Sequence, residues 1–332
     1  MNILIFYNET LINLNIVMNK YFSRIVVCAA LSLFCSASSW AADAVKLINP
    51  VFYSKEQTAE YLTTGTAYLA NWGTFDVLSR LKRDGVSYDD VVAFVKDQTR
   101  SWNEEDKKSA MKGVAGLNAI IKKEGYKLPL PEKIPFMLSS MNEEGGCLAY
   151  TRKEGVAFGS SAEVEIDSRL IAHELFHVLT RNNPDFKKKI YELIGFNTLK
   201  KDIAVPESFK NRMISNPDVD HHNTYATFKI GGKKVDCAMF IYSDEEWNGG
   251  SFFDYLKVGL LEIDKEKCEL VLKDGEPVIH DVDEAEDFYD KVGNSTSYII
   301  DPEEILADNF SFLLCYGSDS DLCVAMRKLL LK

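Results

Sequence analysis

The chain has 332 residues, of which 46% are hydrophobic, and its formal net charge is −12. This hydrophobic content can form a sizeable core and excludes a disordered chain, and the length suggests one large domain or two closely packed ones. The acidic balance, without a long run of lysine and arginine, argues against a nucleic-acid-binding protein, which needs a basic face.

The N-terminal residues have the three-part pattern of an export signal. Its parts are a basic start, an apolar stretch and a small-residue cleavage site: Lys20 with Arg24, residues 25–34, and Ser39-Trp40-Ala41. We therefore expect residues 1–41 to be an upstream extension and signal peptide, with translation starting at Met18 and a periplasmic or secreted mature protein. The apolar stretch is short for a membrane helix, and no other stretch approaches about 18 uninterrupted apolar residues, so we expect no stable membrane span.

Beyond the predicted signal peptide, the chain contains five cysteines: Cys147, Cys237, Cys268, Cys315 and Cys323. An exported protein can form disulfides, and two disulfides with one remaining thiol are one possibility. Cys315 and Cys323 are the first pair to consider, because a short loop joins them. The alternative is that the cysteines are buried, unpaired thiols.

Residues 42–130 are predicted to form an N-terminal helical subdomain. Apolar residues recur at helical spacing over 55–125. Ser87 is of the residue type that caps the N-terminus of a helix, and an apolar helical face follows it.

Residues 131–332 are predicted to form a second domain that carries the chemistry. Short apolar runs over 133–140 and 145–159, bounded by glycines and polar turns, predict strands and a hairpin. A helix over about 167–181 follows, which Asp167 or Ser168 can cap and Asn183-Pro184 stops.

The rest of this domain alternates between predicted strands and helices. The expected elements are a helix over 185–196, a β-hairpin over 224–242, strand-like pieces over 250–282, and helices over 301–315 and 321–332. Together with the N-terminal helices, these elements predict an α+β fold.

The predicted helix over 167–181 contains the sequence His-Glu-x-x-His, formed by His173, Glu174 and His177. Successive helical residues advance by about 100°, so these three side chains share one arc and can reach a common atom. Two imidazoles one turn apart suit a metal ion, and the carboxylate beside them can take a proton from a metal-activated water. The alternative is a core helix whose histidines are satisfied by hydrogen bonds, although burying three such groups without a metal is unfavourable.

This motif, following a strand hairpin, resembles the zincin metallopeptidases, and the resemblance covers the helix and the strands just before it. A catalytic zinc usually has three protein ligands and one open position, so a third ligand is expected. The metzincin branch of the family is excluded, because Thr180 and Asn183 stand where its extended motif has Gly and His.

The downstream sequence "DPEEILADNF" resembles the E-x-x-A-D arrangement of the gluzincins. The resemblance implies that Glu304 is the third zinc ligand and that Asp308, one turn later, orients a ligand histidine. Glu304 could instead belong to a capping box in which Asp301 is the N-cap residue. Glu303 and Asp308 are the alternative ligands.

The resemblance also implies a zincin-like fold, with a small mixed or antiparallel sheet packed on the metal helix. The implied activity is zinc-dependent hydrolysis of peptide bonds, with Zn²⁺ as cofactor and Glu174 as general base. Zincins hold an extended peptide at the edge of the sheet, which in this chain would be formed by residues 147–159. The alternative for this segment is a simple hairpin that covers the core.

The group that stabilises the oxyanion is left open by the sequence. The candidates are His221, His222, Tyr225 and Tyr298, whereas His280 is interpreted as structural or at the surface. Two other functions compete with peptide hydrolysis: a zinc amidohydrolase that acts on a small or cell-wall amide, and a non-catalytic zincin-like protein that binds a partner. The sequence does not indicate the oligomeric state.

Overall fold

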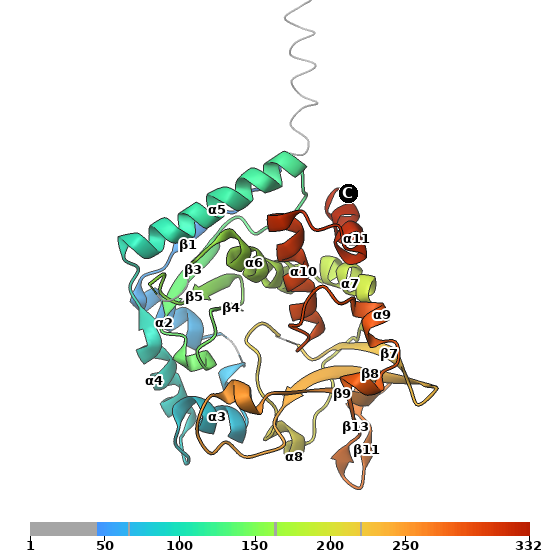
Figure 1. The fold of residues 1–332 in the computed structure, drawn as a ribbon. Helices are drawn as coiled ribbons and strands as arrows, with labels where there is room; N and C mark the ends of the chain where they lie inside the picture. The colour runs from blue at the N-terminus through green and yellow to red at the C-terminus, as the bar shows by residue number, and fades with distance from the viewer. Residues whose placement is uncertain (1–44, 66, 163–164, 220) are drawn as a thin grey trace, which may run out of the picture. The chain divides into compact units, whose positions relative to one another are not determined.

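The computed structural model describes residues 45–332, except 66, 163–164 and 220. Lys46–Lys332 form one compact unit of helices and several β-sheets, which confirms the predicted α+β class (Figure 1). The predicted signal peptide, including Met18, lies outside the described residues. Among the helices of the described part, none combines the length and the apolar character needed to cross a membrane.

The first part of this unit is mainly helical, as predicted. Its helices are α2 (Lys55–Thr63), η1 (Leu69–Asn71), α3 (Thr74–Leu81), α4 (Tyr88–Gln98) and α5 (Glu104–Glu124). Ser87 caps α4, because its hydroxyl oxygen accepts a hydrogen bond from the backbone N–H of Asp90 at 3.2 Å.

Strand pairing joins this helical part to the remainder of the chain. β1 (Pro50–Phe52) lies parallel to β3 (Ile134–Ser139), and β2 (Thr99–Arg100) pairs with β3 in the antiparallel direction. The predicted division between residues 130 and 131 therefore falls within one compact unit, whose first sheet uses strands from both sides of it.

The first sheet ends at a strand beside the motif helix. Its strands follow the order β1-β3-β5-β4, with β5 (Gly155–Phe158) parallel to β3 and β4 (Ala149–Arg152) antiparallel to β5. β4 and β5 form the predicted hairpin. Because β4 is the edge strand, its outer backbone groups have no strand partner among the described residues.

The motif helix is α6 (Ser168–Asn182), close to the predicted span. Asp167 is its N-cap residue, because its Oδ1 accepts a hydrogen bond from the backbone N–H of Leu170 at 2.8 Å. The next helix, α7 (Pro184–Tyr191), starts with a proline, which is favourable at a first helical position and ends the preceding helix.

Helices on two sides fix the position of α6. α5 approaches it closely at Gly113, where a Cβ atom would lie 2.6 Å from Ile171 Cδ1 and 3.0 Å from the carbonyl oxygen of Ile166, so only glycine fits without displacing α6. α10 (Pro302–Tyr316) also packs on α6, and α11 (Asp321–Leu330) packs on α10. The two predicted C-terminal helices are therefore confirmed, and one of them faces the motif.

The second sheet is antiparallel and follows the order β10-β9-β8-β7-β6, with β13 also paired with β9. Its strands are β6 (Phe196–Thr198), β7 (Thr224–Ile230), β8 (Lys233–Tyr242), β9 (Lys257–Asp264), β10 (Glu269–Leu270) and β13 (Ile279–Asp281). β7 and β8 are the predicted hairpin. It turns at Gly231 and Gly232, whose φ values of 55° and 75° favour glycine.

The remaining elements are short. They are the two-stranded sheet of β11 (Leu272–Lys273) and β12 (Glu276–Pro277), the helices α8 (Glu207–Lys210) and α9 (Phe288–Val292), and the 3₁₀ turns η2 (Asn142–Glu144), η3 (Glu192–Ile194), η4 (Phe252–Tyr255) and η5 (Val282–Glu284).

All five cysteines of the described region are free thiols. Cys237, Cys268 and Cys323 are buried. Cys315 and Cys323, the first pair to consider, are not joined, and the thiol of Cys323 lies 3.3 Å from the carbonyl oxygen of Asn309. Of the two alternatives that the sequence left open, disulfides or unpaired thiols, the structure has unpaired thiols.

Candidate metal centre

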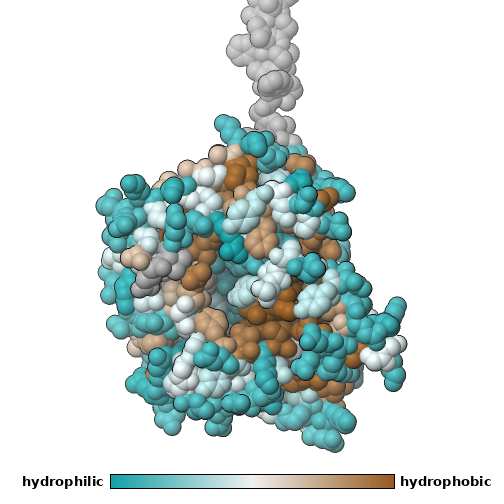
Figure 2. All heavy atoms as spheres, in the orientation of Figure 1, coloured by the Kyte–Doolittle hydropathy of each residue, from teal (hydrophilic) through white to brown (hydrophobic). Residues whose placement is uncertain are grey.

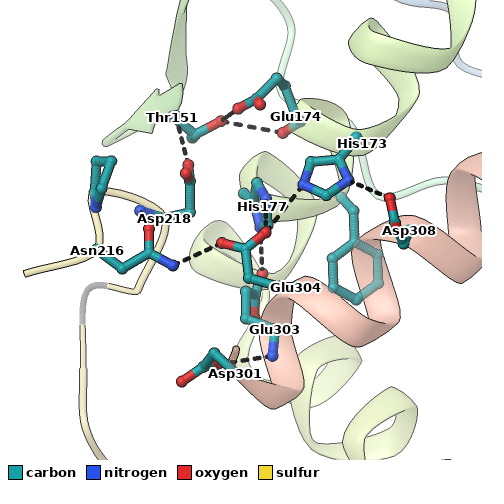
Figure 3. Close-up of polar contacts among 12 residues, drawn as sticks. Thr151, His173, Glu174, His177, Asn216, Asp218, Asp301, Glu303, Glu304 and Asp308 are labelled. Atoms are coloured by element: carbon teal, nitrogen blue, oxygen red, sulfur yellow. Dashed lines mark hydrogen bonds and ion pairs between the residues drawn. The ribbon is translucent and has the colours of Figure 1, made fainter. Parts of the chain in front are cut away.

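The facing sides of α6 and α10 bring the three predicted ligands together (Figure 3). Oε2 of Glu304 lies 3.0 Å from Nε2 of His173 and 3.6 Å from Nε2 of His177. One ligand atom from each residue lies within 4.8 Å of the other two. Two imidazole nitrogens and a carboxylate oxygen at such separations form a ligand set that zinc accepts.

The ring of His177 supplies a direct test of whether a cation fits. Its Nε2 atom is buried and has no hydrogen-bond partner among the described residues. Burying a polar nitrogen without a hydrogen-bond partner costs free energy. A divalent cation bound to the lone pair of this nitrogen would remove that cost. The alternative of a core helix with hydrogen-bonded histidines does not explain this atom.

Each ligand histidine presents its second ring nitrogen to a carboxylate of α10. Nδ1 of His173 lies 3.2 Å from Oδ1 of Asp308, and Nδ1 of His177 lies 3.0 Å from Oε1 of Glu303. Thr296 donates a hydrogen bond to the other oxygen of Asp308 at 2.5 Å. Such carboxylates fix the orientation and tautomer of a metal-binding imidazole.

Glu303 has a role that the sequence did not suggest. Besides facing His177, its carboxylate accepts hydrogen bonds from Thr180 Oγ1, at 2.5 Å, and from the hydroxyl of Tyr191. These bonds hold it behind the imidazole and away from the point where the ligand atoms meet, which removes it as an alternative ligand.

Glu304 does not form the capping box that the sequence allowed. Asp301 is the N-cap residue of α10, and it accepts the backbone N–H of Glu303 at 2.8 Å. The carboxylate of Glu304 instead faces the two histidines, and its second oxygen accepts a hydrogen bond from the side-chain amide of Asn216 at 2.7 Å.

The carboxylates around the histidines favour a positive charge at this point. Burial alone would lower the pKa of His177, but the charges of Asp218 and Glu304 raise it to about 9. Burial also opposes protonation of His173, yet its hydrogen bonds with Asp308 and Glu304 raise its pKa well above the usual value. A metal cation would supply the same charge, in exchange for these protons.

Glu174 lies beside the three candidate ligands but is not one of them. Its Oε2 accepts a hydrogen bond from the hydroxyl of Thr151 on β4 at 2.9 Å. Burial, with the negative charge of Asp218 second, raises the pKa of Glu174 to about 8. The carboxylate is therefore fixed in a position where it can exchange a proton near neutral pH.

Asp218 joins the site from the loop between α8 and β7. Its carboxylate forms a second cluster with Glu174 and His177, in which one ligand atom from each residue lies within 4.8 Å of the others. No sequence motif marks this residue, because its position depends on how the loop between α8 and β7 returns to β4.

A small cavity of about 70 Å³ opens beside these residues. Figure 2 shows apolar side chains gathered around a hollow on this face of the molecule. The polar side of the cavity includes His173, Glu174, Glu304 and Tyr298, and the apolar side is lined by Ile214, Ile241, Phe252, Phe253, Leu256 and Ile300. A lining that combines an apolar wall with a few convergent polar groups is typical of a binding site.

Three of the four predicted oxyanion donors lie away from this cavity. His221 and His222 line a separate cavity of about 480 Å³; His221 faces the carboxylate of Asp202 at 3.0 Å, and His222 stacks on Phe240. Tyr225 packs against the hydrophobic core of the second sheet. We therefore remove all three from the candidate catalytic residues.

Tyr298 is the one predicted donor that lines the small cavity. Its ring centroid lies 6.2 Å from that of His173. His280 is outside the site, as predicted: its Nε2 lies 2.8 Å from a carboxylate oxygen of Glu262 on β9, where it holds β13 to the sheet.

The position of His222 predicts a loss of stability in mild acid. Burial lowers its pKa from 6.5 to about 4, and its Nδ1 is buried without a partner among the described residues. The folded pKa lies below the unfolded one, so the unfolded state binds more protons between these values and the free energy of unfolding decreases as the pH falls from 6.5 to 4. The effect is on the order of 3 kcal/mol.

A His222→Phe variant can keep the stacking on Phe240 and cannot titrate. We expect chemical denaturation at pH 7.5 and pH 4.5 to show a smaller loss of stability for this variant than for the wild type. An equal loss in both proteins would contradict the assignment.

No protein-family model, no curated protein and no solved structure matches this chain. Its function is therefore inferred from the geometry of the site.

Proposed function

We propose that this chain is an exported zinc-dependent metallopeptidase with a zincin-like catalytic domain of the gluzincin type. The observation that carries the proposal is the meeting of His173, His177 and Glu304 at one point, where Nε2 of His177 is buried without a hydrogen-bond partner among the described residues. Asp308 and Glu303 support it, because they orient the two imidazoles from behind.

The chemistry follows from what the protein's own residues can hold and move. Bound zinc would supply a Lewis acid that acidifies water and polarises a carbonyl group. Glu174, held by Thr151, accepts a proton from the attacking water and passes it to the leaving nitrogen. The phenol of Tyr298 donates a hydrogen bond to the developing oxyanion.

The substrate in this proposal is a peptide in extended conformation. β4 is the edge strand of the first sheet and carries Thr151, which contacts Glu174, so a strand added along β4 would pass directly beside the site. The apolar wall of the small cavity favours a substrate with an apolar side chain next to the cleaved bond.

The position of Glu174 favours catalysis over a structural zinc. A structural zinc site is closed by four protein ligands and has no use for a carboxylate held beside the metal. The same position is compatible with hydrolysis of a small or cell-wall amide, which remains the second candidate function.

Peptide cleavage by the purified chain tests the proposal. We expect a mixture of synthetic peptides to be cleaved, cleavage to stop with 1,10-phenanthroline, and added zinc to restore it. Cleavage that is insensitive to the chelator would contradict the proposal, and cleavage of cell-wall amides without cleavage of peptides would favour the second candidate.

A Tyr298→Phe variant tests the oxyanion donor separately. We expect kcat to decrease about 10-fold to 1,000-fold with little change in KM, because the lost hydrogen bond forms in the transition state. Tyr225→Phe is the matched control and should keep the wild-type kcat, since Tyr225 lies outside the site. Equal kcat values for the wild type and Tyr298→Phe would remove Tyr298 from the mechanism.

A further inference from the structure

The loop segment Ser215–Val219 lies between the two cavities described above and contributes to the lining of both. Ser215 and Asn216 line both the cavity of about 480 Å³ and the cavity of about 70 Å³ at the metal centre. The segment approaches the metal centre from a different part of the chain than α6 and α10 (Figure 3).

Arginine side chains hold the main chain of this segment. Arg80 donates a hydrogen bond to the carbonyl oxygen of Ser215 at 2.8 Å, and Arg152 and Arg181 both donate to that of Pro217, at 2.9 Å and 3.1 Å. Arg80 and Arg152 are buried. These arginines bind backbone carbonyl oxygens, which are present in any peptide, so the contacts do not depend on the side chains of the segment.

The side chain of Asp218 occupies the edge of the first sheet. Its Oδ1 accepts a hydrogen bond from the backbone N–H of Thr151 at 2.6 Å. Thr151 is on the edge strand β4, so this N–H is the donor that an added peptide strand would use. The segment therefore takes the hydrogen bond that we assign to the substrate.

The same side chain occupies the space beside Glu174 and the metal ligand His177. A carboxylate oxygen of Asp218, a carboxylate oxygen of Glu174 and a ring nitrogen of His177 all lie within 4.8 Å of one another. A water or carbonyl group that reacts with the help of Glu174 must use this space. From the same side, Asn216 donates a hydrogen bond to the carboxylate of Glu304, the third ligand, at 2.7 Å (Figure 3).

We propose that Ser215–Val219 occupies the place along β4 where an extended peptide substrate would bind. Asp218 blocks both the backbone of this edge strand and the space beside Glu174 where the reacting groups would lie. The inference rests on the proposed function. In this conformation the enzyme is latent, and an extended peptide binds by displacing the segment. The apparent affinity for substrate is then the intrinsic affinity multiplied by the fraction of molecules in which the segment is displaced.

The test compares Asp218→Ala with Asp287→Ala in the full, zinc-loaded chain. Asp287 is a matched control, because its carboxylate also accepts a hydrogen bond from a strand N–H, that of Lys229 at 2.7 Å, far from the metal centre in the chain's second sheet. Zinc binding is measured first. If the wild type binds no zinc, the proposed function itself fails.

The deciding readout is the affinity for a peptide hydroxamate, measured by calorimetry. We expect Asp218→Ala to bind it about ten-fold more tightly than the wild type, and Asp287→Ala to bind it as the wild type does. Equal affinities for Asp218→Ala and wild type would overturn the proposal. So would weaker hydroxamate binding, which makes Asp218 a recognition residue, or a loss of zinc from Asp218→Ala, which makes it a resident ligand.

A second variant covers the case in which Asp218→Ala does not fold. Asp218→Asn keeps an oxygen that can accept the N–H of Thr151 and removes the negative charge from the metal centre. We expect its hydroxamate affinity to lie between those of the wild type and Asp218→Ala, and an affinity equal to that of the wild type would overturn the proposal.

Discussion

A Glu174→Gln variant is expected to bind one zinc ion, as the wild type does, and to hydrolyse peptides at least about a hundred-fold more slowly. The amide has the size of the carboxylate and its oxygen can still accept the hydrogen bond from Thr151, so the helix and the ligand set are preserved. It cannot accept a proton from water, and this step is the one that the mechanism assigns to Glu174.

Zinc content and kcat/KM must be measured on the same samples. Glu165→Gln is the matched control, because Glu165 lies shortly before α6, is exposed and pairs with Lys112. It should keep both values. If Glu174→Gln were as active as the wild type, the catalytic interpretation of the motif would be refuted, even with zinc present.

The Glu304→Ala variant is expected to lose more than about a hundred-fold in zinc affinity. It removes a ligand atom, whereas Asp308→Asn and Glu303→Gln only weaken the orientation of His173 and His177, which typically lowers affinity about 10-fold to 100-fold. Competition with a calibrated zinc chelator gives the rank order. Unaltered affinity in Glu304→Ala would return Glu304 to a role at the start of α10.

The motif helix and its boundaries were predictable, because local signals determine them. His173, Glu174 and His177 share a helical arc by geometry alone, and the cap at Asp167 and the stop at Pro184 are short-range effects. The roles of Glu304 and Asp308 were expected from the resemblance to the gluzincin pattern, and these residues, four apart on α10, both face His173.

The contact of Glu303 with Nδ1 of His177 could have been expected from the sequence but was not predicted. Two adjacent carboxylates, Glu303 and Glu304, start a helix that faces two histidines one turn apart, so each can serve a different imidazole. The sequence alone does not decide which carboxylate binds the metal and which binds the ring from behind. That decision depends on Thr180 and Tyr191, which come from other turns and helices.

The groups contributed by loops could not be predicted from local patterns. His221 and His222 have the right chemistry for an oxyanion donor, but the path of their loop places them on the larger cavity. The same loop carries Asp218 to the edge strand through contacts with arginines that are distant in the sequence. Long-range contacts of this kind leave no periodic signal.

Equilibrium dialysis against zinc tests the central claim most directly. The wild-type chain is predicted to bind one zinc ion per molecule, and a variant that combines His173→Ala with His177→Ala is predicted to bind none. A wild type without stoichiometric zinc, or a double variant that binds as much zinc as the wild type, would contradict the metal centre and the function built on it.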